Sequence, residues 1–245
     1  MRIKVINPDY GKSLEALRQR ECMLSSIARH DTEISMECVT NTKVEIDSAL
    51  DVVVAGAEIV NLAIKAEKDG FDAIVLYCLS DPAIVACRES VSIPVVGGGQ
   101  ASILIACSIG YRFSLITTSK RRITEKEESI RYLGIDPYRL ASVRSVDISL
   151  ADSYKSIEDT VNRLVKVGKE CVDKDGAQVL VLGCLSYAGM SEEVSSIVGV
   201  PVVDPAFAAI NMAELLYAQK LSHSKIAYPY PPVGERSWSG GQIII

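Results

Sequence analysis

Apolar residues along this 245-residue chain follow two different periods. Short, nearly continuous apolar runs are typical of strands covered on both faces, and apolar residues recurring every three or four positions are typical of helices with one buried face. Because the two kinds of segment alternate, the pattern predicts an α/β fold with mainly parallel sheets. The predicted strands cover residues 2–7, 33–38, 73–77, 94–96, 112–117, 140–143, 179–183 and 201–203, and the predicted helices begin near residues 13, 49, 81, 100, 120, 151 and 191.

Two of the predicted helices differ in how much of their surface is apolar. The helix over residues 49–68 places Val52, Val53 and Ile59 on its apolar face. The helix over residues 100–109 is apolar nearly all round, so we expect it to be buried within the subunit or between subunits. A third helix follows Asp81, and the proline after Asp81 suits a first helical turn, so we expect the Asp81 side chain to cap this helix.

The second half of the chain repeats the first. Cys184 lies 106 residues after Cys78, each cysteine ends an apolar run, and each is followed by Leu-Ser. The strand at Arg112 lies 110 residues after the one at Arg2. This near-constant offset predicts two α/β halves related by a pseudo-two-fold axis, each a mainly parallel four-stranded sheet flanked by helices, with an active site in the cleft between them.

The predicted domain limits follow from this repeat. The N-terminal half covers residues 1–110, with room for the end of the chain to return to it, and the C-terminal half covers residues 111–225. Residues 226–245 are rich in Pro, Gly and aromatic residues and show no periodicity. We expect an extended arm that packs on a neighbouring subunit, because Trp238 and the apolar end of the chain would otherwise be exposed.

Composition and charge exclude several classes of function. The net charge is −5, and the densest basic cluster, residues 120–122, is followed by acidic residues, which argues against nucleic-acid binding. No apolar run reaches ~18 residues and no signal-peptide pattern precedes the first strand, so we expect a cytoplasmic protein that does not bind membranes. The seven cysteines show no C-x-x-C spacing, which favours reduced thiols over disulfides or a zinc site.

The matched cysteines are the candidate catalytic residues. Open α/β sheets bind ligands at the carboxyl ends of their strands, where Cys78 and Cys184 are expected. A thiol has an ordinary pKa near ~8.5, which a helix N-terminus lowers, and both cysteines precede predicted helix starts. A thiolate and a thiol on opposite faces of an acidic carbon can invert that stereocentre without a cofactor. We expect the other cysteines to be small buried residues: Cys22, Cys38, Cys87, Cys107 and Cys171.

An enolate formed in such a reaction needs hydrogen-bond donors, and the loops near the two cysteines offer several. Backbone N–H groups after each cysteine and nearby hydroxyl groups suit this role. No metal-ligand spacing is present, His30 and His223 are expected at the surface, and the glycines at residues 97–99 do not complete a nucleotide-binding motif. The predicted substrate-binding residues are Asn7, Asp9, Tyr10, Leu79, Ser80, Asp81, Gly97, Gly98, Thr117, Thr118, Leu185, Ser186 and Tyr187.

These motifs together resemble the aspartate/glutamate racemase superfamily and, within it, the hydantoin and allantoin racemase group. The resemblance covers the chain to about residue 220. It implies racemisation by Cys78 and Cys184 without a cofactor, a small-molecule substrate, and assembly into homo-oligomers. The motifs that carry it are Ile6-Asn7-Pro8, Cys78-x-x-Asp81-Pro82, residues 94–102 and 109–118, and Leu182-Gly183-Cys184 with Ala188-Gly189-Met190.

Three loops depart from the usual pattern of that group, and we expect them to set the substrate. Asp9-Tyr10 stand where Asn-Thr is usual, Leu79-Ser80 stand where an aromatic residue and Gly are usual, and residues 185–187 intervene before Ala-Gly-Met. The leading hypothesis is a racemase of 5-substituted hydantoins or a related cyclic ureide. One alternative is a racemase or isomerase of an open-chain amino acid or dicarboxylate, and another is a non-catalytic small-molecule binding or sensing protein.

Overall fold

Each of two units of the chain is built on its own parallel sheet. The computed structural model describes residues 1–148 and 156–244. Contacts divide the chain into one unit of Met1–Gly98 with Ala209–Ile245 and a second unit of Gly99–Ala208. These units differ from the sequence-derived limits at 110 and 225 in two apolar helices. Most of α4 (Gly98–Ile109) lies in the second unit, and most of α9 (Pro205–Ala218) lies in the first.

The sheet of the first unit has the order β2-β1-β3-β4, with all strands parallel. Helix α2 packs on β1 and β3, α1 lies beside β2, and α3 lies beside β4. Apolar side chains of α2 and the sheet, among them Ile59 and Ile74, form the core. The elements are β1 (Arg2–Asn7), α1 (Leu14–Ile27), β2 (Glu33–Cys38), α2 (Ala49–Lys68), β3 (Ala73–Leu76), α3 (Ile84–Ser90) and β4 (Val95–Gly97).

The sheet of the second unit has the corresponding order, β6-β5-β7-β8, again with all strands parallel. Helix α7 packs on β5 and β6, and α8 lies beside β8. Two four-stranded parallel sheets flanked by helices confirm the predicted fold class, while the pseudo-two-fold axis and the cleft stay predictions. The elements are β5 (Phe113–Thr117), η1 (Lys120–Arg122), α5 (Ile123–Tyr132), η2 (Pro137–Arg139), β6 (Leu140–Ser145), α7 (Ile157–Asp175), β7 (Val179–Leu182), η3 (Leu185–Tyr187), α8 (Ser191–Val198) and β8 (Val202–Val203).

Serine caps set where three of the longer helices begin. The side chains of Ser13, Ser48 and Ser156 each accept a hydrogen bond from the backbone N–H three residues later. Such caps satisfy N–H groups that have no partner within the helix. The predicted helix start near residue 151 falls in 149–155, which lie outside the described residues, and the described part of that helix begins at Ile157.

Some expected side-chain positions are wrong. Asp81 does not cap α3, because the helix begins only at Ile84 after Ala83 in a left-handed conformation, with no side-chain cap. Val53 is 75% exposed, since the buried stripe of α2 begins at Ala55. Cys22 is exposed on α1. The apolar helix α4 buries only one face within the chain, and the exposed side chains of Leu104 and Ile109 leave the expectation of burial between subunits a prediction.

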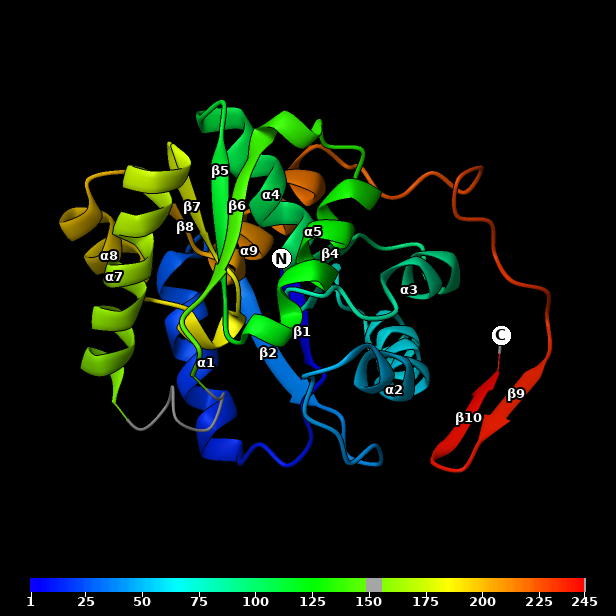
Figure 1. Ribbon diagram of the computed structural model, residues 1–245. Coiled ribbons are helices and arrows are strands. Elements are labelled where there is room, and N and C mark those ends of the chain that lie inside the picture. The colour runs from blue at the N-terminus through cyan, green and yellow to red at the C-terminus, as the bar shows by residue number, and fades with distance from the viewer. Residues whose placement is uncertain (149–155, 245) are drawn as a thin grey trace. The chain divides into compact units, whose positions relative to one another are not determined.

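The C-terminal segment forms a hairpin that packs on its own chain. Strands β9 (Glu235–Trp238) and β10 (Gly241–Ile244) pair antiparallel, and Figure 1 shows this red hairpin beside α2. Ile243 is buried in the core of the first unit, and Trp238 packs against the same core. Residues 235–244 therefore form a hairpin and not the extended arm that we expected, while packing on a neighbouring subunit stays a prediction. Among the described residues, no helix is both long enough and apolar enough to cross a membrane.

Candidate active site

The loop that carries Cys78 begins where β3 ends. The N–H of Tyr77 donates a hydrogen bond to the carbonyl of Ile6 at 2.8 Å, which continues the pairing with β1. The chain then turns, because the N–H of Asp81 donates to the Cys78 carbonyl at 3.2 Å. Among the described residues Cys78 forms no disulfide, and it is half-buried, whereas Leu79 is 7% exposed and anchors the turn. The structure thus presents one partly accessible thiol at the carboxyl end of a central strand.

The Asp81 carboxyl group packs directly on Gly97 at the end of β4. A Cβ atom on Gly97 would lie 2.2–2.5 Å from the carboxyl atoms of Asp81, closer than side chains approach one another. Only glycine at this position lets the Asp81 carboxyl lie there. The structure therefore brings Asp81 and Gly97 together, with Gly98 next in the chain and also buried.

The carboxyl end of β1 holds the next predicted residues. Asn7 is 1% exposed, and its Oδ1 accepts a hydrogen bond from the N–H of Asp9 at 3.1 Å. Its Nδ2 is buried and has no hydrogen-bond partner among the described residues. A buried N–H donor without a partner is costly in a folded protein, so it marks a place where a ligand oxygen could bind.

Asp9 and Tyr10 are tied to the loop that follows β2. The Oδ1 of Asp9 accepts a hydrogen bond from the N–H of Ile46 at 2.9 Å, and the N–H of Tyr10 donates to the carbonyl of Val44 at 2.9 Å. Burial raises the pKa of Asp9 despite the bond from Ile46 and the nearby Lys12. The Tyr10 side chain is 40% exposed. The position of the Asp9-Tyr10 loop thus depends on where residues 40–46 lie.

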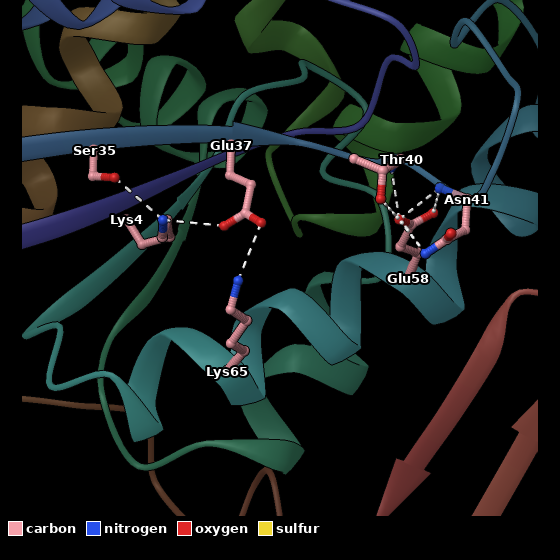
Figure 2. A network of polar contacts seen from close by, with 7 residues as sticks. All are labelled: Lys4, Ser35, Glu37, Thr40, Asn41, Glu58 and Lys65. Atoms are coloured by element: carbon pink, nitrogen blue, oxygen red, sulfur yellow. Dashed lines mark hydrogen bonds and ion pairs between the residues drawn. The ribbon is translucent and has the colours of Figure 1, made fainter. Parts of the chain in front are cut away.

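A buried carboxylate that the sequence analysis missed holds that loop. Glu58 on α2 is 3% exposed and accepts hydrogen bonds from the N–H groups of Thr40, Asn41 and Thr42 at 2.7, 3.0 and 2.8 Å. Burial alone would raise the pKa of Glu58, but these bonds outweigh it and hold the pKa below its ordinary value. Figure 2 shows Glu58 reaching from α2 to Thr40 and Asn41. The signal in the sequence was a carboxylate inside the buried stripe of a helix.

Glu37 on β2 offers a contrast within the same view. Its carboxylate lies between Lys4 and Lys65, with N–O distances of 3.2 and 3.3 Å (Figure 2). Both of these partners lie outside residues 39–46, so Glu37 joins strands and helix without holding the loop. Glu37 therefore contributes to the fold of the first unit, whereas Glu58 also holds a loop beside the candidate site.

The loop that carries Cys184 begins in the corresponding way at the end of β7. The N–H of Gly183 donates to the carbonyl of Ile116 at 2.8 Å, and a Cβ on Gly183 would lie 2.4 Å from that same oxygen. The half-buried Cys184 then opens the turn η3, where its Sγ accepts from the N–H of Ser186 at 3.4 Å and from the Ser186 hydroxyl at 2.9 Å. Both donors favour a negative charge on sulfur.

The neighbours of Ser186 have buried side chains. Leu185 is 2% exposed, and Tyr187 is fully buried in the core of the second unit. These two side chains anchor the turn, so any contact they make with a ligand would come from their backbone. Thr117, at the end of β5, is 1% exposed and Thr118 is half-buried. Their carbonyls accept hydrogen bonds from Val146 and Ile148, each at 3.1 Å.

Asp204 is a second buried carboxylate that the sequence analysis missed. It follows β8 and is 4% exposed. One carboxyl oxygen accepts from the N–H of Gly189 at 2.7 Å, and the other accepts from the N–H of Ala206 at 2.9 Å. Burial raises the pKa of Asp204 in spite of these bonds. Gly189 lies five residues after Cys184 in the sequence, so Asp204 is tied to the thiol-bearing loop.

The remaining cysteines and histidines lie in different surroundings. Burial raises the pKa of Cys87 to about 12 and also raises the pKa of Cys171. The expectation that His223 is a surface residue is wrong: it is half-buried, its Nε2 lies 2.8 Å from the Val95 nitrogen, and burial together with Arg88 lowers its pKa to about 4. Within the described parts of the chain, no group of three or more His, Cys, Asp or Glu side chains could hold a metal ion.

Comparisons of the sequence and of the structure with known proteins both find racemases. A profile of the family described as Asp/Glu/Hydantoin racemase matches residues 3–213. A hydantoin racemase from Pseudomonas sp. (strain NS671) is 31% identical over 94% of this chain and 92% of its own length. A hydantoin racemase from Rhizobium meliloti is 30% identical over 95% and 96%. The structure of allantoin racemase from Klebsiella pneumoniae superposes with a TM-score of 0.90 at 26% identity, covering 97% of this chain and 96% of that one.

Proposed function

This chain belongs to the Asp/Glu/Hydantoin racemase family, and we propose that it inverts an acidic stereocentre next to a carbonyl in a 5-substituted hydantoin or a related cyclic ureide. The observation that carries the proposal is a half-buried thiol, outside any disulfide among the described residues, at the same point of each sheet, Cys78 after β3 and Cys184 after β7. The relatives and the structural neighbour named as hydantoin and allantoin racemases support the substrate class.

The proposed reaction needs no group other than the two thiols to move protons. One cysteine, as thiolate, takes the proton from the stereocentre and leaves an enolate. The other, as thiol, donates a proton to the opposite face of the same carbon. After one turnover the first sulfur carries the proton and the second is the thiolate, so the enzyme is ready for the opposite enantiomer. Because racemases are isomerases, the proposed reaction makes this chain an isomerase.

Hydrogen-bond donors in the two units would support different charged species in this reaction. In the first unit, the buried Nδ2 of Asn7, which has no partner among the described residues, can donate to the enolate oxygen. In the second, Ser186 donates to the Cys184 sulfur and would favour its thiolate form. Preorganised donors of this kind are commonly worth 10²–10³-fold in rate when one is removed. We therefore expect Asn7→Ala to lower kcat by about 10²-fold.

The test is racemisation and isotope exchange in D2O. One enantiomer of a 5-substituted hydantoin should lose optical rotation and gain α-deuterium faster than it does without protein. Cys78→Ala and Cys184→Ala should each remove the activity, and the matched control Cys22→Ala, an exposed cysteine in the first unit, should keep it. Full activity in either variant would refute the two-thiol mechanism.

The substrate class is tested in the same experiment. Allantoin, free amino acids and dicarboxylates are screened beside the hydantoins. Exchange with open-chain amino acids alone would replace the cyclic ureide with that class and leave the thiol mechanism standing. Saturable binding of a compound by calorimetry, without exchange of any substrate, would identify a binding protein instead and overturn the proposal.

A further inference from the structure

The ends of the last strands differ between the two units at one position. In the first sheet, Val75 of β3 pairs with Val96 of β4, and Gly97 follows. In the second, Val181 of β7 pairs with Val203 of β8, and Asp204 follows. Since the thiols lie three residues after Val75 and Val181, Gly97 and Asp204 hold the same place relative to Cys78 and Cys184.

A carboxyl group is nonetheless present at this place in both units, and it comes from opposite partners. In the first unit it belongs to Asp81, on the thiol loop, and packs on the strand-end residue Gly97. In the second it belongs to the strand-end residue Asp204 and accepts a hydrogen bond from Gly189, on the thiol loop, at 2.7 Å. The carboxyl group comes from the thiol loop in the first unit and from the last strand in the second, but in both units it links the thiol loop to the last strand.

We propose that Asp81 and Asp204 are equivalent positioning residues, each of which fixes the thiol-bearing loop of its unit to the end of the last strand. The role rests on the proposed function only in so far as the thiols carry protons. Neither carboxylate needs to contact the substrate. Asp81 belongs to the loop itself, and its carboxyl group packs on Gly97 at the end of β4. Asp204 lies outside the loop, and its carboxyl group accepts a hydrogen bond from the N–H of Gly189 on the loop.

A helix cap alone does not explain Asp204. One of its oxygens does cap α9, accepting from Ala206 at 2.9 Å and from Phe207 at 3.4 Å. The other oxygen accepts from the N–H of Gly189 at 2.7 Å, the shortest of the three distances. From Gly189 the chain runs back to Cys184 through η3, in which the Tyr187 N–H donates to the Cys184 carbonyl at 3.1 Å. A buried charge-assisted bond of this kind holds the loop more firmly than a neutral one would.

The experiment measures the alkylation rate of each thiol by mass spectrometry of iodoacetamide-treated protein. Asp204→Ala should change the rate constant of Cys184 by about threefold or more and leave Cys78 unchanged, because loop geometry sets thiol reactivity. Asp81→Gly should change the rate constant of Cys78 and leave that of Cys184 unchanged. Glycine is chosen because Asp81 has a φ of 45°, which glycine adopts freely. Cys87 and Cys171, which are buried, and Cys22, which is exposed, serve as internal references.

Two further variants separate positioning from general loss of stability. Asp136→Ala removes a carboxylate that caps η2 in the same unit without touching the thiol loop, so it should leave both thiols unchanged. Asp204→Asn keeps an acceptor for the Gly189 N–H and should retain more of the wild-type Cys184 rate than Asp204→Ala. It also serves as the test if the alanine variant does not fold.

The outcomes also distinguish this proposal from the proposed function. Equal changes at both thiols, or no change at either, would overturn the positioning role even if racemisation continues. The crossed pattern in a protein that racemises nothing would support the positioning role and refute the racemase assignment.

Discussion

The two units of this protein use one topology to present one thiol each, but they surround that thiol with different residues. Both sheets place the cysteine two residues beyond the third strand of the unit, and in both the residue before it donates a hydrogen bond of 2.8 Å to the neighbouring strand. That preceding residue is the buried Tyr77 in the first unit and Gly183 in the second. The topology therefore fixes the position of the thiol, while local packing decides which residues can stand beside it.

The difference between Tyr77 and Gly183 has a steric cause. Tyr77 has room for a side chain, which lies with its ring centroid 5.5 Å from the Arg20 guanidinium. Gly183 has no room even for a methyl group, because the carbonyl of Ile116 occupies that space. Backbone atoms of a central strand cannot move aside as a flexible side chain can. The second thiol loop is therefore the less tolerant of the two.

The largest effect we predict comes from filling that space. Gly183→Ala should lower the free energy of unfolding by about 3 kcal/mol, because overpacking against backbone forces the strands apart. Urea unfolding followed by circular dichroism measures it. Gly56→Ala is the matched control: its new Cβ would lie 3.7 Å from Ala83, an ordinary contact on helix α2, so the variant should be neutral or slightly more stable. A Gly183→Ala protein as stable as wild type would contradict the steric account.

The corresponding change in the first unit should affect reactivity more than stability. Gly97→Ala places its Cβ against the Asp81 carboxyl group, which is the end of a side chain and can swing away. We expect a loss of about 1 kcal/mol or less in unfolding free energy, together with a changed alkylation rate at Cys78. A stability loss as large as that of Gly183→Ala would show that the two glycines are needed for the same reason.

Removing the charge of Glu58, which holds the loop after β2, should have an intermediate effect on stability. Glu58→Gln removes the charge from a buried group that three backbone N–H groups depend on, so the free energy of unfolding should fall by about 2 kcal/mol. Glu37→Gln, which removes two ion pairs that do not involve the loop, should cost about 1 kcal/mol or less. In substrate assays, only Glu58→Gln should raise KM, since only Glu58 holds the loop tied to Asp9 and Tyr10. Equal effects on KM would contradict that division.

The smallest effect we predict is a pair of opposite pH dependences. The pKa of Glu58 lies below its ordinary value of 4.5, so the stability Glu58 contributes is present above that pH and is lost as the pH falls. The pKa of Asp204 lies above its ordinary value of 3.8, so its contribution is present below that pH and is lost as the pH rises through the raised value.

Unfolding of the wild type, Glu58→Gln and Asp204→Asn between pH 3.5 and 7 tests this comparison. The difference between wild type and Glu58→Gln should shrink as the pH falls. The wild type should lose stability relative to Asp204→Asn as the pH rises through the raised pKa of Asp204. Differences that change with pH in the same direction for both variants would contradict the opposite pKa shifts.

Much of the fold was accessible from the sequence because it depends on local patterns. The strands at residues 2–7 and 33–38 and the helix at 49–68 have the predicted limits. The internal repeat indicated two sheets with one cysteine each, and family membership is confirmed by the match over residues 3–213. The individual site residues stay predictions. The structure places Asp81 against Gly97, and it ties Asp9 and Tyr10 to the loop that follows β2.

Three of the wrong predictions share one feature: each depends on a partner distant in the sequence. Asp81 was expected to cap α3, yet its carboxyl packs on Gly97, which lies on another strand. His223 was expected at the surface, yet it lies against Val95 at the edge of the sheet. The C-terminal hairpin packs on α2, far from it in the chain. No periodicity in a single segment reveals such pairs.

By itself the sequence determined the alternation of strands and helices, the repeat and the pair of strand-end cysteines, because hydrophobic periodicity and chain topology are properties of short segments. The tertiary structure alone decided which carboxyl groups lie between the thiol loops and the last strands. Asp81 lies on its thiol loop and Asp204 lies at the end of a last strand, and only the pairing of β3 with β4 and of β7 with β8 brings both carboxyl groups to the same point between loop and strand. The reason is physical: a carboxyl group packs on or hydrogen-bonds to whatever backbone the fold brings near it, and it can come from either side of that contact.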